Sequence, residues 1–173
     1  GDFRAPERLF AVLMQVAGRA GRAGAASEVV VQTRFPLHPL FDALARYDFA
    51  SFANAQLAER RASALPPFVF QALLRVEATK LETALDFLGR GKSAGEPLCA
   101  AGAPPAGRPG APVTLFDPVP MPMARLAGKE RAQLLLESAS RKALHAFLDA
   151  WLPRIAELKG AVRWQIEVDP IEI

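Results

Sequence analysis

The chain has 173 residues, a formal net charge of +3 that comes mostly from arginine, one cysteine (Cys99) and two histidines. This length holds one compact domain, or one small domain plus a piece of another, and excludes a complete large motor enzyme; the mild positive charge permits nucleic acid without requiring it. So few cysteines and histidines exclude a disulfide framework and a Cys/His zinc cluster, so we expect a reducing cytosolic compartment and no bound metal. No apolar run approaches the roughly 20 residues that cross a bilayer, so we expect no membrane association.

The first third of the chain predicts three helices and one strand. The helices follow apolar residues at helical spacing, and the strand is a short β-branched run. Gly18 opens a glycine-rich segment, which predicts that the first helix ends there. The expected elements are a helix from Pro6 to Gly18, a buried strand over 29–33, and helices over 40–46 and 48–61.

Beyond the proline-containing segment 65–68, strands and helices alternate regularly. The expected elements are a strand over 68–76, a helix over 80–89, strands over 113–116 and 131–137, a helix over 140–158 and a strand over 162–168. The order β-α-β-β-α-β is that of the split β-α-β, or ferredoxin-like, arrangement. It predicts an α+β fold with an antiparallel sheet and two helices on one of its faces.

The segment between Gly91 and Pro112 is poor in side chains that could pack, because 16 of its 22 residues are Gly, Ala or Pro. We interpret it as a mobile surface loop that carries Cys99 as an incidental exposed thiol. Its first three residues, Gly-Lys-Ser, resemble the end of a phosphate-binding P-loop. The glycine required five positions earlier is Asp86, within a predicted helix, so we reject that motif.

The segment 15–22 carries two glycine-arginine pairs. It could be a helix C-terminus with glycine caps and solvated arginines, and the two pairs alone favour that interpretation. The spacing of all eight residues is more specific. Glycines allow a backbone to approach a ligand closely, and paired guanidinium groups can bind phosphate oxygens bidentately.

A family resemblance covers nearly the whole chain. Residues 2–10, followed by 15–22, resemble the end of the second motor lobe in PriA, the family of primosomal replication-restart helicases. In this resemblance Gln15, Gly18, Arg19, Gly21 and Arg22 match motif VI of superfamily 2 helicases. Further matches follow in chain order at 38–40, 57–61, 65–68, 162–164 and 168–170.

The resemblance implies that residues 1–63 complete a RecA-like helicase lobe and that 64–173 form the C-terminal domain of the family. It further implies the C-terminal part of an ATP-dependent 3′ to 5′ DNA helicase that recognises stalled or branched forks and restarts replication by primosome assembly. Forked or branched DNA, single-stranded DNA-binding protein and other primosome proteins are then the partners, in the bacterial cytoplasm at the nucleoid. ATP and Mg would bind the full-length protein, and zinc only a part upstream of this piece; alone, the piece would bind no cofactor and be inactive as a motor.

A hypothesis from another class remains open. The chain could be a stand-alone adaptor, in which a ferredoxin-like module binds a replication protein and the helices of the front half serve as scaffold.

The resemblance also assigns roles to single residues. Arg19, Arg22 and Gln15 would be catalytic, with Arg22 favoured as the arginine finger and Arg19 as a sensor of the γ-phosphate, while Gly18 and Gly21 would bind nucleotide. Two further groups belong to the C-terminal domain: Arg125, Lys129 and Arg131 for DNA, and Arg141 and His145 for the acidic tail of single-stranded DNA-binding protein. Arg141 would open a helix capped by Ser140, where a carboxylate meets both a guanidinium group and the positive end of a helix dipole.

Two features bear on the strength of these assignments. Glu130 stands where the family usually has an aromatic residue, which weakens the case for close contact with a DNA backbone there. The aromatic side chains Phe68 and Phe70 alternate on a strand as in sheets that stack bases, but we expect at least one of them in the core. Trp151 and Trp164 are expected to be packing residues.

Overall fold

The computed structural model describes residues 3–20, 28–101, 112–171 and 173. The chain divides into two compact units, Gly1–Leu65 (unit 1) and Pro66–Ile173 (unit 2), each described by itself. Unit 1 is helical in its described residues and unit 2 contains an antiparallel sheet with helices, which confirms the predicted α+β class.

The described residues of unit 1 form three helices around a small apolar core. They are α1 (Ala5–Ala20), α2 (Pro39–Ala45) and α3 (Phe49–Ala62), so the two helices expected over 40–46 and 48–61 are confirmed. Phe10 of α1 stacks on Phe52 of α3 with ring centroids 4.2 Å apart, and both side chains are buried. Asp48 caps α3 by accepting a hydrogen bond of 3.0 Å from the backbone N–H of Ser51.

Two expectations for unit 1 are wrong. Helix α1 does not end at Gly18 but continues to Ala20. Residues 29–33 form no strand, and Val30 is 82% exposed rather than buried. A strand needs a hydrogen-bonding neighbour, and the described part of unit 1 contains no other strand with which this β-branched run could pair.

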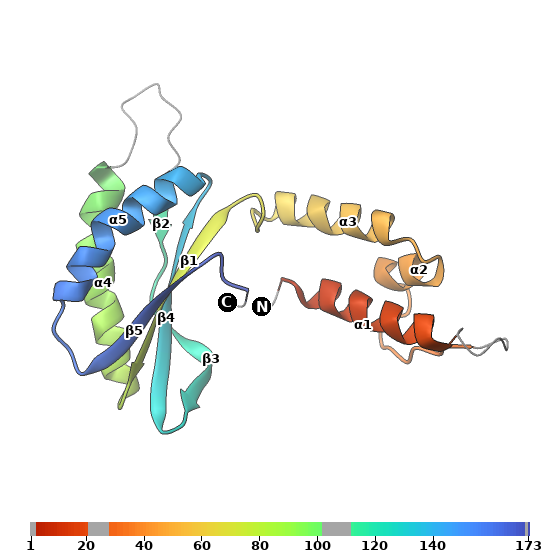
Figure 1. Cartoon of the computed structure of the whole chain (residues 1–173), viewed down its shortest axis with the longest axis horizontal. Coiled ribbons are helices and arrows are strands. Elements are labelled where there is room, and N and C mark those ends of the chain that lie inside the picture. The colour runs from red at the N-terminus through yellow and green to blue at the C-terminus, as the bar shows by residue number, and fades with distance from the viewer. Residues whose placement is uncertain (1–2, 21–27, 102–111, 172) are drawn as a thin grey trace. The chain divides into compact units, whose positions relative to one another are not determined.

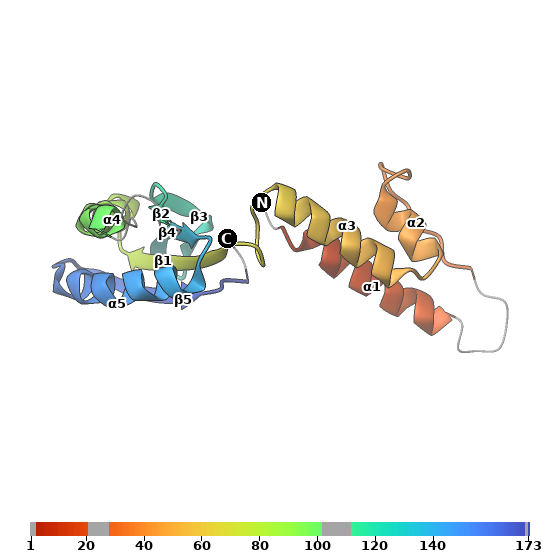
Figure 2. The ribbon, with the colours of Figure 1, turned by 90° about the horizontal axis from the view of Figure 1, so that it is seen from above.

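The described residues of unit 2 form a five-stranded antiparallel sheet with two helices on one face (Figures 1 and 2). Its elements are β1 (Phe70–Ala78), α4 (Leu81–Ala101), β2 (Val113–Leu115), β3 (Val119–Leu126), β4 (Lys129–Ser138), α5 (Arg141–Glu157) and β5 (Val162–Val168). The strand order is β2-β4-β1-β5, and β3 also pairs with β4. Strand β5 occupies the residues that the sequence predicts.

Side chains alternate between the two faces of each strand, and this alternation builds the core. On β1 the even-numbered residues from Ala72 to Ala78 pack with buried side chains of α4 and α5. Trp151 of α5 is fully buried there and donates a hydrogen bond of 2.8 Å to the backbone oxygen of Gly91. The expectation of a packing role is confirmed for this tryptophan, and the partly buried Trp164 packs against the same core. Phe70, also partly buried, packs there as well.

The expected surface loop after Gly91 is wrong over its first eleven residues, because α4 continues to Ala101 with Pro97 inside it. The glycines there are packing residues: a Cβ atom on Gly95 would lie 2.9 Å from the Trp151 side chain. Cys99 is consequently half-buried against the core instead of exposed in a loop. Residues 102–111 of the expected loop lie outside the described residues.

The sequence prediction also missed β3. Its alternating prolines, Pro120 and Pro122, read as breakers, but proline is tolerated on an edge strand because its missing N–H need not face a partner. Strand β3 pairs on one side only, with β4, and its register shifts between Pro120 and Arg125. It forms a hairpin with β4 through Ala127 and Gly128, which both have positive φ.

Candidate functional site

The described part of the predicted motif lies on the solvent-facing side of α1. Gln15, Gly18 and Arg19 are exposed and fall at positions i, i+3 and i+4, which share one helix face. No atom lies within 4 Å of the position that a Cβ would take on Gly18, so packing among the described residues does not require glycine there. Gly21 and Arg22 lie outside the described residues.

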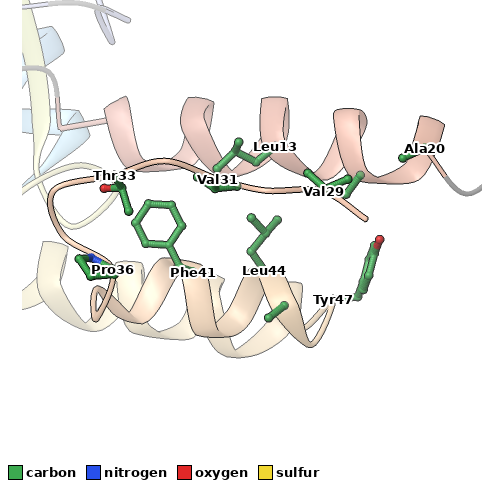
Figure 3. A pocket seen from close by; sticks show the side chains of 11 residues that line it. Leu13, Ala20, Val29, Val31, Thr33, Pro36, Phe41, Leu44 and Tyr47 are labelled. Atoms are coloured by element: carbon green, nitrogen blue, oxygen red, sulfur yellow. The ribbon is translucent and has the colours of Figure 1, made fainter. Parts of the chain in front are cut away.

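The opposite side of α1 borders an apolar groove of about 410 Å³ within unit 1 (Figure 3). Leu13 of α1 and the α2 side chains Phe41 and Leu44 face one another across it, and the extended residues Val29 and Val31 lie alongside α1. The described motif residues Gln15, Gly18 and Arg19 are not part of its lining and lie on the exposed side of α1, together with the apolar side chains Val12 and Val16.

A buried arginine joins the start of α1 to the end of α3. Arg60, 9% exposed, forms an ion pair with Glu7 and donates a hydrogen bond of 3.3 Å to the backbone oxygen of Phe3. Its guanidinium carbon also lies 4.9 Å from the centroid of the Phe3 ring. Two of the sequence stretches that carry the family resemblance are therefore in direct contact, and Arg60 has a structural role.

In unit 2 the predicted DNA-binding residues gather at the β3–β4 hairpin. Arg125 is 76% exposed and its Nε lies 3.7 Å from a carboxylate oxygen of Glu130; Lys129 is exposed. Arg131 is less accessible, with 18% of its side chain exposed and its Nε 3.7 Å from a carboxylate oxygen of Glu77 on β1. These ion pairs are longer than good hydrogen bonds, which leaves guanidinium N–H groups at the hairpin with capacity for a ligand.

The predicted peptide-binding residues lie on the first turns of α5. Arg141 begins this helix, and the hydroxyl of its N-cap residue, Ser140, accepts a hydrogen bond from a backbone N–H within the first turn. The Arg141 guanidinium lies over the Phe70 ring, 4.8 Å from the centroid, and its Nη1 is 3.0 Å from a carboxylate oxygen of Asp169. His145 is exposed one turn later. The site thus already holds a carboxylate beside the arginine.

The two groups of residues lie at opposite ends of the sheet. Arg131 pairs in register with Glu77 near the end of β1, whereas Arg141 contacts Phe70 at its start. Glu77 is seven positions after Phe70, and at about 3.3 Å per residue this gives a distance of about 23 Å along the strand. Unit 2 can therefore present two distinct binding surfaces.

Residues that the sequence prediction did not single out line the face of the sheet away from the helices. They include Arg75 and Glu77 of β1 and Arg163 of β5, which are paired in register or lie in adjacent rows. Polar residues at every second position of a strand are the sequence pattern that could have identified this face. Arg163 belongs to one of the stretches that carry the family resemblance, but it received no role.

Among the described residues, no group of three or more His, Cys, Asp or Glu side chains is placed to hold a metal ion. Burial raises the pKa of the Cys99 thiol, which disfavours the reactive thiolate. The helices that the structure describes include none long and apolar enough to cross a bilayer.

Comparison with known proteins identifies the family. Residues 61–171 match the family model described as the primosomal protein N C-terminal domain. The replication restart protein PriA of Haemophilus influenzae is 37% identical over 99% of this chain, which covers 22% of that protein. PriA of Treponema pallidum is 34% identical over 99% of the chain and 24% of its own length, and PriA of Synechocystis is 30% identical over 99% and 19%.

The chain belongs to the PriA family, as the resemblance in the sequence suggested, and it matches the C-terminal part of that family. It spans about a fifth to a quarter of the length of these curated relatives. Among solved structures, the designed protein Foldit4 has a TM-score of 0.40 and 8% identity over 59% of this chain and 97% of its own, a likeness too weak to support an argument.

Proposed function

We propose that this chain is the C-terminal part of an ATP-dependent 3′ to 5′ DNA helicase that recognises stalled or branched forks and restarts replication by primosome assembly. The observation that carries this proposal is the similarity to replication restart proteins along 99% of the chain. The broader part of this proposal is a role in replication restart, and the motor activity is assigned to the longer protein. The chain alone has no motor activity in this account.

Unit 1 is, in this proposal, the last part of a RecA-like lobe whose motif VI contacts nucleotide. The exposed Arg19, with open space beside Gly18, fits a phosphate that approaches the exposed side of α1. ATP, bound with Mg, supplies the phosphoryl group whose transfer drives the motor. Arg19 and Arg22 stabilise the negative charge of the phosphates, and Gln15 couples nucleotide state to the closure of the lobes.

Unit 2 is the part that holds DNA and partner proteins. Without β3, its strand order and connections fit the split β-α-β, ferredoxin-like arrangement, which we propose as its fold family. Arg125, Lys129 and Arg131 bind the backbone of branched DNA at the hairpin. Arg141 and His145 bind the acidic tail of single-stranded DNA-binding protein at the other end, because a carboxylate there meets a guanidinium group stacked on an aromatic ring.

Several features of the setting follow from the same family. We place the protein in the bacterial cytoplasm at the nucleoid, with other primosome proteins as partners. Zinc is assigned to an upstream part of the longer protein and to none of the residues in this chain.

A titration of the whole chain with fluorescently labelled forked DNA, followed by anisotropy at two salt concentrations, tests the proposal. We expect binding that weakens as salt rises, because phosphate contacts release counterions. The double variant R125A/K129A should weaken binding, while Lys142→Ala, which removes an exposed positive charge at the other end of the sheet, should leave it unchanged. Binding that is absent or insensitive to salt would contradict the proposal, and so would DNA-stimulated ATP hydrolysis by the chain alone.

A further inference from the structure

A small polar hollow lies on the face of the unit 2 sheet that α4 and α5 do not cover. Its volume is about 120 Å³. The hollow is lined by Arg75, Glu77, Met121, Arg131, Arg163, Trp164 and Gln165. Three guanidinium groups from three adjacent strands therefore surround a single carboxylate. The cross-strand register explains this, because Glu77 of β1 pairs with Arg131 of β4 on one side and with Arg163 of β5 on the other.

The positive charge in this hollow is only partly compensated. Arg75 is well paired, with its Nη1 2.8 Å from a carboxylate oxygen of Glu167. Among the described residues, Arg131 has only the 3.7 Å approach of its Nε to Glu77, and this buried Nε has no hydrogen-bond partner there. Arg163 is exposed and forms no ion pair with any residue that the structure describes. One carboxylate thus faces two arginines, so the hollow has room for a second negative group.

We propose that this hollow binds a phosphate group of a nucleic-acid strand, held chiefly by Arg131 and Arg163. A buried guanidinium N–H without an acceptor costs free energy, and an oxyanion supplies the acceptor. Guanidinium groups bind phosphate oxygens bidentately, and two of them on β4 and β5, the strands on either side of β1, can hold one phosphate from both sides. The inference deepens the proposed DNA grip of unit 2 and rests on it.

The surroundings of the hollow favour nucleic acid over a peptide. The exposed Gln165 lies beside Arg75 in the next row of the sheet, and amide and guanidinium groups are side chains that hydrogen-bond to bases and phosphates. Of the lining residues that the structure describes, Met121 and Trp164 are apolar and the other five are charged or carry an amide. The hollow also lies at the same end of the sheet as the hairpin residue Lys129. A strand bound at the hairpin can therefore continue into the hollow.

The test is an anisotropy titration of the whole chain with a labelled single-stranded oligothymidylate at several salt concentrations. Arg163→Gln removes an exposed charge without disturbing the core. Because each phosphate contact on a single strand contributes about 0.7 to the slope of log affinity against log salt, this variant should lower the slope by about that amount and weaken binding at every salt. Glu77→Gln removes the competing carboxylate and should tighten binding. The matched control, Arg154→Gln, removes an exposed arginine from α5, on the other side of the sheet, and should leave affinity and slope unchanged.

Two competition experiments, one with inorganic phosphate and one with an acidic peptide, identify which ligand the hollow binds. If inorganic phosphate displaces the oligonucleotide no better than chloride of equal ionic strength, the site binds the backbone of a strand. If inorganic phosphate displaces it and this displacement depends on Arg163, the site binds free phosphate. Both results support the phosphate chemistry. An acidic peptide that binds through Arg163 while the oligonucleotide does not would overturn the inference. Wild-type affinity in Arg163→Gln would overturn the inference and leave the DNA grip standing, and a wild-type chain that binds no DNA would overturn both.

Discussion

The close packing of α4 against α5 predicts that Gly95→Ala destabilises unit 2, although alanine is the better helix former. A Cβ atom at this position would lie 2.9 Å from Leu115 Cδ1, 2.9 Å from Trp151 Nε1 and 3.1 Å from Phe147 Cζ. Real Cβ atoms almost never approach so closely, so a neighbour must move. Trp151 is a poor candidate to move, because it is fully buried and hydrogen-bonded at 2.8 Å to the backbone of Gly91.

The magnitude follows from two opposing terms. Replacing glycine by alanine inside a helix gains about 1 kcal/mol in propensity. Forcing an extra methyl group into a packed core costs about 1–3 kcal/mol. The two terms leave a net loss of about 0–2 kcal/mol, and we expect about 1–2 kcal/mol for Gly95→Ala because three side chains are contacted at once. Gly89 lies on the same helix with no atom within 4 Å of its Cβ position, so Gly89→Ala is the matched control and should stabilise by about 0.5–1 kcal/mol.

The assay is urea unfolding of the whole chain followed by tryptophan fluorescence. Both tryptophans of the chain, Trp151 and Trp164, lie in unit 2, so the signal reports on that unit. The midpoint for Gly95→Ala should fall below that of the wild type and the midpoint for Gly89→Ala should rise above it. Equal stabilisation by both substitutions would refute the reasoning, since it would mean that residue 95 does not pack against α5.

Three further predictions concern single side chains. Because burial raises its pKa, Cys99 should react with iodoacetamide more slowly in the folded chain than in urea, and equal rates would contradict its packing. The hydrogen bond from Ser51 lowers the pKa of Asp48 below its ordinary value of 3.8. The ionised Asp48 therefore stabilises α3 above pH 3.8, and this stabilisation is lost as the pH falls through the lower pKa of the folded state. Circular dichroism should show that Asp48→Asn removes this pH-dependent loss of stability. Asp169→Asn frees Arg141 from its internal carboxylate and should tighten binding of an acidic peptide in anisotropy titrations, with unchanged affinity as the contrary result.

Much of unit 2 could be predicted because its elements are encoded locally. Alternating apolar residues placed β5, and the Ser140 cap placed the start of α5. The failures have a common physical origin in tertiary context. Glycine and alanine after residue 90 read as a loop when taken alone, but next to Trp151 the same small residues allow a helix to pack closely. Proline on β3 reads as a breaker, although an edge strand accepts it.

The candidate sites likewise divide into features that local sequence predicts and features that depend on tertiary contacts. Local sequence pattern was enough to indicate an arginine at the start of α5, but not its stacking on Phe70 or its pairing with Asp169, which come from distant parts of the chain. Likewise, Arg131 was assigned from the family resemblance, whereas the neighbouring Arg163 enters the same hollow only through the strand order of the sheet. Residues that meet across strands are set by topology, which a single stretch of sequence does not contain.

The most direct test of the account is whether unit 2 binds DNA and an acidic peptide at opposite ends of its sheet at the same time. The measurement is an anisotropy titration of the whole chain with a labelled acidic-tail peptide of single-stranded DNA-binding protein, with and without saturating unlabelled forked DNA. The account predicts that the peptide binds in both cases, and that Arg141→Ala abolishes peptide binding without changing the affinity for DNA, whereas Lys142→Ala changes neither. Displacement of the peptide by DNA, or peptide binding that survives Arg141→Ala, would contradict it.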